Sequence, residues 1–332
     1  MRDDLNIFLS VRQAMTGLIV SILAFSFAYG DGWQENPAMF NPSGVPSLPF
    51  SQPRFADLDG DGDPDLIIGS LSSKPFYMTN IGSATSPKFQ HVEDIFESVS
   101  SLDAEVAVFY DIDNDGDLDM ISGGYSGLNL FRNVGTVHYP IFEKVENYFS
   151  GIVAGRYPVP DVADVNNNGL GDLVVGFSED GAVKVYYNSG TDSAAVYSES
   201  NSITLGDVGL YAYPVFCDPD HDGDLDILVG RDGAGLIYYQ NTGTQDSPNW
   251  QQNTGVFHGL ATEGYFNSPV LADISGDGKQ DLIYGTANGP LTYYRNTGSA
   301  STPAWTKNTS LFGGIIDVGG ASSPFFYDFD GD

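Results

Sequence analysis

The chain has 332 residues, with 44 acidic against 13 basic side chains, and its formal net charge is −31. So few Lys and Arg residues cannot form the basic face that nucleic-acid binding requires, which excludes a nucleic-acid partner. Hydrophobic residues make up 41% of the chain, enough for a packed core and against wholesale disorder. The single cysteine, Cys217, excludes any intrachain disulfide framework.

The first 30 residues have the character of an export leader. Arg2 and Arg12 flank a polar start, and residues 15–28 form a short apolar stretch with small residues near its end. That run of about 14 residues is short for a membrane-spanning helix, which needs roughly 20. It is typical of a signal peptide cleaved near Ala28. Two aspartates weaken the basic start, so an uncleaved signal anchor is the alternative. We therefore expect a secreted or cell-surface protein, which contacts a membrane only through such an anchor or a C-terminal one.

An acidic motif recurs along the rest of the sequence. The pattern Asp-x-[Asp/Asn/Ser]-x-[Asp/Asn]-Gly-x-x-Asp occurs five times, and a sixth copy is cut off by the end of the sequence. The opening residues are Asp57, Asp111, Asp164, Asp218, Asp273 and Asp328, at spacings of 53 to 55 residues. A constant period of this size indicates supersecondary units that are stacked or arranged radially.

Other features recur at fixed distances from the motif. A short apolar run ending in glycine follows each complete copy, and then comes an aromatic-rich run closed by an Asn-x-Gly turn. In five copies a proline stands four residues before the opening aspartate: Pro53, Pro160, Pro214, Pro269 and Pro324. No helical period of useful length appears, so each unit is predicted to have four short strands. Such units predict an all-β fold, a β-propeller of four-stranded blades; a linear β-solenoid is the competitor, but its coils are usually shorter.

The segment at Trp33 resembles the outermost strands that begin at Trp250 and Trp305. It lacks a blade of its own, so we expect it to complete the last blade and close the ring. Because the sequence stops in mid-loop, we also expect a fragment with five full blades, an open arc in isolation. The predicted organisation is a signal peptide or anchor (1–30), an orphan outer strand (31–46), blades one to five (47–100, 101–153, 154–207, 208–262 and 263–317) and the start of a truncated sixth blade (318–332).

The repeated motif carries the oxygen ligands that a hard cation such as calcium prefers. Positions one, three, five and nine would supply side chains, position seven a backbone carbonyl, and the glycine at six permits the sharp turn. The predicted ligands are Asp57, Asp59, Asp61, Asp63 and Asp65 in loop one; Asp111, Asp113, Asp115, Asp117 and Asp119 in loop two; Asp164, Asn166, Asn168, Leu170 and Asp172 in loop three; Asp218, Asp220, Asp222, Asp224 and Asp226 in loop four; Asp273, Ser275, Asp277, Lys279 and Asp281 in loop five; and Asp328, Asp330 and Asp332 in the partial sixth loop.

A single loop of this kind would be ordinary, because acidic turns are common on protein surfaces. Bunched carboxylates repel one another, however, and repeating that cost in register favours a bound cation that offsets it. We therefore predict up to five complete Ca²⁺ sites. Loop three, with only two carboxylates, is expected to be the weakest, since affinity rises with ligand charge.

The Asp-x-Asp-x-Asp-Gly-x-x-Asp-Leu loops before a short apolar strand resemble the FG-GAP and VCBS-type repeats of integrin α-subunit propellers and many secreted or surface proteins. The resemblance spans roughly residues 33 to 332. It implies a propeller, usually of seven blades, in which each loop joins the first two strands of a blade and binds calcium. It implies function only loosely, because one fold hosts many functions.

The sequence predicts no catalytic residues. The four histidines share no repeat phase, Cys217 is expected to be a packed, inert thiol, and no hydrolase, phosphate-loop or zinc motif occurs. Asn308 opens a glycosylation sequon that matters only in a eukaryotic source. The expected function is a calcium-binding recognition or adhesion module for glycans or extracellular proteins. The alternative is the propeller of a secreted enzyme such as a polysaccharide lyase.

Overall fold

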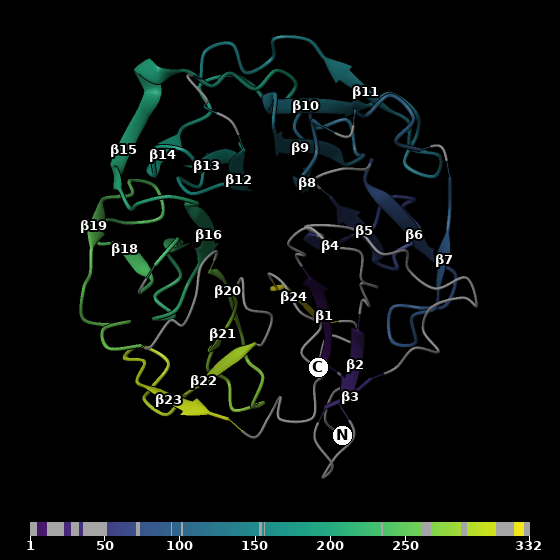
Figure 1. Ribbon diagram of the computed structural model, residues 1–332. Helices are drawn as coiled ribbons and strands as arrows, with labels where there is room; N and C mark the ends of the chain where they lie inside the picture. Colours follow the sequence, from purple (N-terminus) through teal and green to yellow (C-terminus); the bar gives the residue numbers. More distant parts are fainter. Residues whose placement is uncertain are drawn as a thin grey trace.

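The chain folds as six four-stranded antiparallel sheets around one central axis in a computed structural model (Figure 1). The structure describes residues 5–11, 23–27, 33–35, 52–70, 74–93, 95–100, 102–152, 155, 157–233, 235–260, 267–286, 291–309 and 322–328. Over these ranges the only helix is a single 3-10 turn, Glu199–Asn201. No helix in the described part is long and apolar enough to cross a membrane.

Five blades are built from strands that follow one another in the sequence, each running from the axis outward. They are β4 (Gln52–Ala56), β5 (Asp65–Gly69), β6 (Phe76–Asn80) and β7 (Phe89–His91); β8 (Val106–Tyr110), β9 (Asp119–Gly124), β10 (Gly127–Asn133) and β11 (Phe142–Val145); β12 (Pro158–Ala163), β13 (Asp172–Phe177), β14 (Ala182–Tyr186) and β15 (Ser202–Asp207); β16 (Tyr213–Cys217), β17 (Asp226–Gly230), β18 (Ile237–Asn241) and β19 (Trp250–Gln252); and β20 (Ser268–Ala272), β21 (Asp281–Gly285), β22 (Thr292–Asn296) and β23 (Trp305–Asn308). The predicted propeller of four-stranded blades, with five full blades, is confirmed.

The sixth sheet joins the two ends of the chain. Its order is β24 (Ser322–Asp328), β1 (Leu5–Val11), β2 (Leu23–Phe27) and β3 (Trp33–Glu35), from the axis outward. β24 pairs antiparallel with β1 over seven residue pairs, and it also contacts β20 and β4 on its two sides. The ring is therefore closed in this structure, and the expected open arc is wrong for it. β3 occupies the outer edge, the place that the Trp33 alignment gives it.

The closure uses residues that the sequence assigns to a leader. β1 and β2 lie within residues 1–30, where they take the second and third places of the sixth sheet. The physical reason is that the free edge of β24 offers unpaired N–H and C=O groups to any extended segment that can reach it. Whether this segment is cleaved as a signal peptide, and how many blades a longer chain would hold, stay predictions.

The second strand of each blade is buried along its whole length. In blades one to five, β5, β9, β13, β17 and β21 contain no residue outside the buried class, because neighbouring blades cover both faces of these strands. The hydrophobic clusters accordingly cross from blade to blade: Ile67 and Tyr77 of blade one pack with Met120 and Phe131 of blade two. This explains why the sequence shows apolar runs here rather than an alternating pattern.

Proline and glycine stand at repeated positions that suit these two residue types. The repeated prolines lie in the innermost strands, which are sheet edges, so the missing N–H breaks no ladder bond. The glycine that ends the second strand lies under the next blade's first strand. A Cβ on Gly176 would lie 2.3 Å from the Ala212 carbonyl oxygen, and one on Gly230 would lie 1.9 Å from that of Asn267.

We expect Gly176→Ala to destabilise the protein by about 1–3 kcal/mol, the usual cost of overpacking, because the obstructing atom is backbone and cannot rotate away. Gly155→Ala is the control, since its nearest neighbour would be 3.9 Å away. Denaturant unfolding of the two variants measures the difference. Equal stability of the two would show that the blades are not in the close contact described here.

Candidate metal centre

The acidic motifs form five loops, here called loops one to five, between the first and second strands of blades one to five. In each, the carboxylate at position one accepts the backbone N–H at position six: Asp57 from Gly62 at 3.0 Å, and likewise in the other four copies. Gly62 has φ +92°, and the residue at position four also lies in the left-handed region. The glycine at position six is thereby explained, as is the Gly, Asn or His at position four.

The aspartate at position nine links each loop to the Asn-x-Gly hairpin of the same blade. These five side chains are 0–1% exposed, and each accepts the backbone N–H of the hairpin's asparagine at 2.6–2.8 Å: Asp65 from Asn80, Asp119 from Asn133, Asp172 from Asn188, Asp226 from Asn241 and Asp281 from Asn296. A tyrosine hydroxyl donates to three of them, as Tyr77 does to Asp65 at 2.7 Å. The residue predicted as a ligand is thus also a structural link in every blade.

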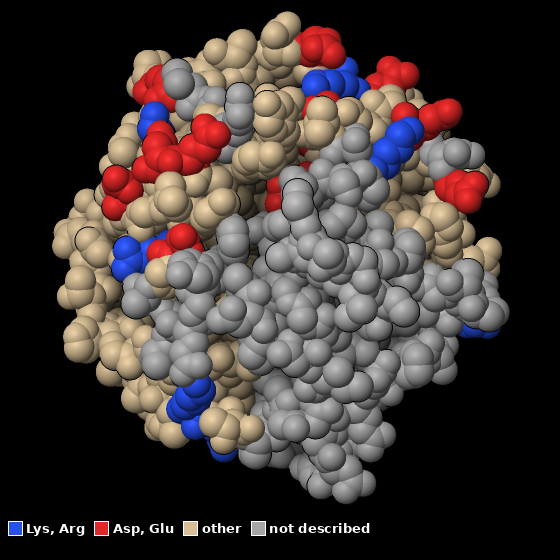
Figure 2. Space-filling model, in the orientation of Figure 1, with Lys and Arg blue, Asp and Glu red and all other residues tan. Residues whose placement is uncertain are grey.

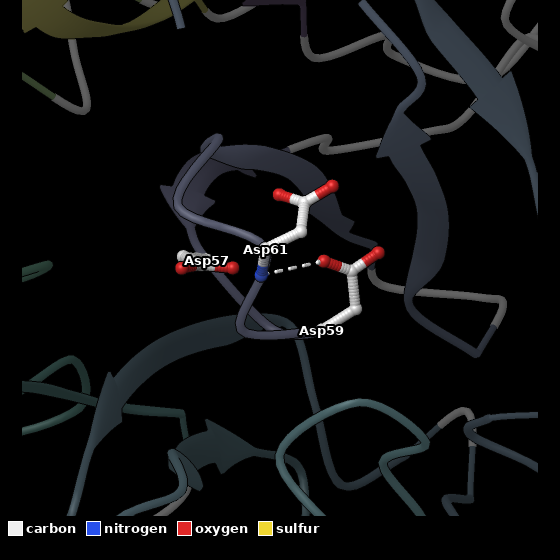
Figure 3. Close-up of side chains that lie close together, drawn as sticks. All are labelled: Asp57, Asp59 and Asp61. Carbon is white, nitrogen blue, oxygen red and sulfur yellow. Dashed lines mark hydrogen bonds between the residues drawn. The ribbon is translucent and has the colours of Figure 1, made fainter. Parts of the chain in front are cut away.

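Three loops gather carboxylates closely enough to hold a metal ion. In each group the oxygens lie within 4.8 Å of one another: Asp57, Asp59 and Asp61 in loop one; Asp111, Asp113 and Asp115 in loop two; and Asp218, Asp220 and Asp226 in loop four. Figure 3 shows the loop-one side chains around a single turn, where the Asp61 N–H donates to Asp59 at 3.3 Å. The predicted set is therefore brought together in part: positions one, three and five in two loops, and one, three and nine in the third.

Buried oxygens without partners show that a cation fits these loops. Asp57 Oδ1, Asp113 Oδ1 and Asp220 Oδ1 are buried and have no hydrogen-bond partner, and neither has Asp117 Oδ1. A buried carboxylate oxygen without a donor is costly, and an ion at the centre of the loop would satisfy it. In loop three, Asn166 Oδ1 is in the same condition.

The electrostatics agree with this geometry. Burial raises the pKa of Asp59 and Asp113, with the neighbouring loop carboxylates adding to the rise. Burial and the Asp115 carboxylate raise the pKa of Asp117 to about 6. These carboxylates therefore resist ionisation next to one another, and a positive charge among them would relieve that strain.

A side chain from the third strand completes three of the loops, and sequence reasoning missed it. The residue just before the hairpin asparagine contacts the position-three aspartate: Thr79 donates to Asp59 at 2.9 Å, Gln240 to Asp220 at 2.7 Å, and Arg132 pairs with Asp113 at 3.0 Å. The signal for it is a polar residue at one constant phase of an otherwise buried strand. These contacts fix the rotamer of a candidate ligand.

The hairpins also connect neighbouring blades at this end of the ring. His138 Nδ1, in the hairpin of blade two, lies 2.6 Å from the Asp59 carbonyl of loop one. Asn167 of loop three donates to Asp246, in the hairpin of blade four, at 3.0 Å. Loops one and three are therefore also held by contacts from a neighbouring blade.

Loops three and five depart from the pattern. In loop three, two amides replace carboxylates, and Asn166 Nδ2 donates to Asp172 at 2.9 Å. In loop five, Lys279 Nζ lies 3.0 Å and Arg295 Nη2 lies 3.1 Å from Asp277 Oδ2. Burial alone would raise the pKa of Asp277, but these two cations bring it below its ordinary value.

The other residues singled out in the sequence stand at the end of a strand or outside the described residues. Asp330 and Asp332 lie outside the described residues, and Asp328 ends β24. Asn308 ends β23, and its glycosylation stays a prediction. Cys217 is buried and free, and burial raises the pKa of its thiol, which agrees with an inert role.

The position-nine aspartates predict how stability depends on pH when no metal is bound. Burial raises the pKa of Asp65, Asp119, Asp172 and Asp226 to about 7. Since an aspartate in an unfolded chain has a pKa of about 3.9, the folded state binds more protons between these values, and stability falls as pH rises through that window. In chelator, we expect a higher melting temperature at pH 5 than at pH 8. Asp172→Asn removes one such group and should flatten the slope; a stability that rises with pH would contradict the assignment.

Comparison with known proteins agrees with the fold and the loops. The FG-GAP-like repeat model matches residues 111–175, 164–229 and 218–284, which together cover more than half of the chain. No curated protein matches the chain. Among solved structures, an Agrocybe aegerita lectin that recognises non-reducing terminal N-acetylglucosamine has a TM-score of 0.52 at 18% identity, over 91% of this chain and 75% of the lectin. The periplasmic gluconolactonase of Pseudomonas aeruginosa has a TM-score of 0.48 at 13% identity, over 98% of this chain and 99% of the enzyme. With its matching repeats, its four-stranded blades and its recurring Asp loops, the chain belongs to the FG-GAP repeat proteins.

Proposed function

We propose that the protein is a calcium-binding extracellular propeller that acts as a non-catalytic recognition or adhesion module. The observation that carries the proposal is the recurrence of the carboxylate cluster at one phase of the repeat in three blades, each with a buried oxygen that lacks a partner. A solvated acidic turn would not leave such oxygens inside the loop.

The donor set favours calcium over other ions. The clustered side chains are all carboxylates, without cysteine or histidine among them, and hard cations prefer such oxygen ligands. Calcium accepts six to eight ligands in flexible geometry, whereas magnesium demands a near-octahedral shell and keeps several waters. Sites of this kind in extracellular modules bind in the range of about 10⁻⁴–10⁻³ M, which fits the secreted or surface location proposed from the leader.

A recognition role needs a contact surface, and the hairpin of blade two offers one. Val134 and Ile141 are paired across the hairpin, and Thr136 bridges to Tyr139, so the pleat puts Val134, Tyr139 and Ile141 on one face. They are 51%, 79% and 54% exposed. The same face is polar in blade four, with Thr242, Thr244, Ser247 and Asn249, and in blade five it carries Thr297, Ser299 and Thr302 beside the small Ala304.

The tryptophans of the outer strands and the tyrosines of the aromatic-rich runs do not offer a comparable surface. Trp250 Nε1 donates to Tyr187 at 3.0 Å, and Trp305 Nε1 donates to the Val256 carbonyl at 2.8 Å. Both rings are half-buried, and Tyr186, Tyr238 and Tyr293 are buried. Interior packing is therefore their role. The most exposed described aromatic, Tyr139, has no counterpart at its position in the other hairpins.

A central cavity is the one observation that favours the enzyme alternative. It measures about 190 Å³ and is lined by Arg54, Asp161 and Tyr213 among others, with Arg54 donating to the Tyr213 hydroxyl at 2.9 Å. Small-molecule sites usually measure about 300–1,000 Å³, so this space is small for a sugar substrate. Recognition on the outer loops is the better-supported proposal, and the similar fold of the Agrocybe lectin, which recognises terminal N-acetylglucosamine, supports a recognition role.

On the face shown in Figure 2, the Lys and Arg side chains of the described residues lie apart from one another, and the acidic groups in view lie in the upper half. This distribution supports a partner other than nucleic acid, as the composition requires.

Calcium removal is the experiment that tests the metal part of the proposal. A site filled at 100 times its Kd adds about 2.7 kcal/mol to the free energy of unfolding, so chelator should lower the melting temperature by more than about 5 °C. Calcium should restore it, and magnesium should do so poorly. A variant with Asp57→Asn, Asp111→Asn and Asp218→Asn should melt alike with and without calcium. If chelator leaves the wild-type melt unchanged, the loops are acidic turns without an ion.

Tyr139→Ser tests the recognition surface, with binding measured on a glycan array and on a panel of extracellular proteins. Removing an exposed aromatic anchor should weaken binding about tenfold or more, which corresponds to about 1.4 kcal/mol. Tyr211→Ser is the control, because Tyr211 is also exposed but stands in the link before blade four. Equal binding by both variants would place recognition elsewhere on the protein. If the wild type bound no glycan or protein, the proposed recognition role would be wrong.

A further inference from the structure

Loop five differs from the other loops in holding two cationic side chains of its own. Lys279 Nζ and Arg295 Nη2 meet at one oxygen, Asp277 Oδ2, at 3.0 and 3.1 Å. The loop itself carries three aspartates and one lysine, and Arg295 reaches it from β22. Loops one and four carry five aspartates each, with neither Lys nor Arg at the corresponding positions.

The two cations stand at positions where the other blades carry different residues. Position seven is aspartate in loops one, two and four and Leu170 in loop three, but Lys279 in loop five. The residue before the hairpin asparagine is Thr79, Arg132, Tyr187 or Gln240 in blades one to four and Arg295 in blade five. Loop two is the nearest case, yet its single Arg132 pairs with Asp113 Oδ2 while Asp113 Oδ1 stays buried without a hydrogen-bond partner.

Lys279 is held in place by all of its donors. An ammonium group has three N–H bonds. Besides Asp277, Lys279 Nζ donates to the carbonyl oxygens of Asn296 at 3.0 Å and Gly298 at 3.2 Å, both in the hairpin of the same blade. The side chain thus bridges the Asp loop and the hairpin, and it is fully paired in that position.

We infer that Lys279, assisted by Arg295, serves as the built-in counter-cation of loop five, so that this loop takes no calcium while loops one, two and four do. The inference rests on the proposed calcium function and reduces the five sites expected from the sequence. An incoming ion would have to break three hydrogen bonds of the ammonium group and meet two positive charges beside Asp277, which cancels much of its attraction.

The rest of the loop keeps the form of a cation site. Asp273 accepts the N–H of Gly278 at 2.7 Å, as position one does in every copy, and Ser275 Oγ at position three is buried without a hydrogen-bond partner. Removing the lysine should therefore expose a usable set of oxygens. Leucine is a suitable replacement, because loop three carries Leu170 at the same place.

The test counts bound Ca²⁺ by equilibrium dialysis with calcium alone as the probe. Asp57→Asn should lower the count by one, whereas Asp273→Asn, the same change in loop five, should leave it unchanged. Lys279→Leu combined with Arg295→Gln should raise it by one, since Gln240 shows that glutamine is accepted at that position. A count that falls by one in Asp273→Asn would overturn the inference.

Melting in chelator provides a readout that needs no calcium. Without Lys279, Asp277 keeps only Arg295, and the carbonyl oxygens of Asn296 and Gly298 lose their donor, so Lys279→Leu should lower the melting temperature by about 2–4 °C. Lys307→Leu is the matched control, because it makes the same charge change on the exposed side of β23 in the same blade. If the two variants melt alike, Lys279 is no counter-cation and the inference is wrong. If the wild type binds no calcium but Lys279→Leu still melts lower, the proposed function fails while the role of the lysine stands.

Discussion

Blades one to five each depend on a carboxylate that is buried between the Asp loop and the hairpin. The aspartate at position nine begins the second strand, accepts the hairpin asparagine's N–H and is almost completely shielded from water. Its hydrogen bonds hold together two turns at the same end of the blade. The same burial makes its negative charge expensive, because desolvation disfavours the ionised form. The loops around it compensate this negative charge in different ways.

The loops of blades one to five compensate the buried negative charge in three ways. Loops one, two and four add further carboxylates and leave buried oxygens unpaired, an arrangement suited to an external divalent ion. Loop three lowers its charge by using Asn166 and Asn168, and one of these amides donates directly to Asp172. Loop five brings its own cations through Lys279 and Arg295. A repeat protein can vary these arrangements independently, because each loop belongs to one blade and affects its neighbours only through a few contacts.

The periodic part of this structure could be predicted from the sequence, and the individual part could not. The spacing of the opening aspartates and the Asn-x-Gly turns determines the five consecutive blades and their strand order, because each of these units folds from local hairpins. The left-handed position six likewise follows from its glycine. The contacts of Arg132, His138 and Lys279 were missed, since each depends on which side chain from another strand or blade happens to reach a loop. Averaging over repeats conceals such residues, while position-by-position differences between repeats point to them.

The sixth sheet shows the limit of reading a repeat by its period. No motif marks residues 5–11 or 23–27 as strands of a blade, and their apolar character is equally that of a leader. What brings them into the ring is the edge of β24, whose backbone groups need partners and whose neighbours β20 and β4 already define where a blade must stand. Strand pairing there depends on backbone hydrogen bonding and on which segment can reach the edge of β24, rather than on a side-chain pattern. A segment with any sufficiently extended apolar sequence can meet that demand, so the identity of the closing strands is the feature of the fold that the sequence specifies least.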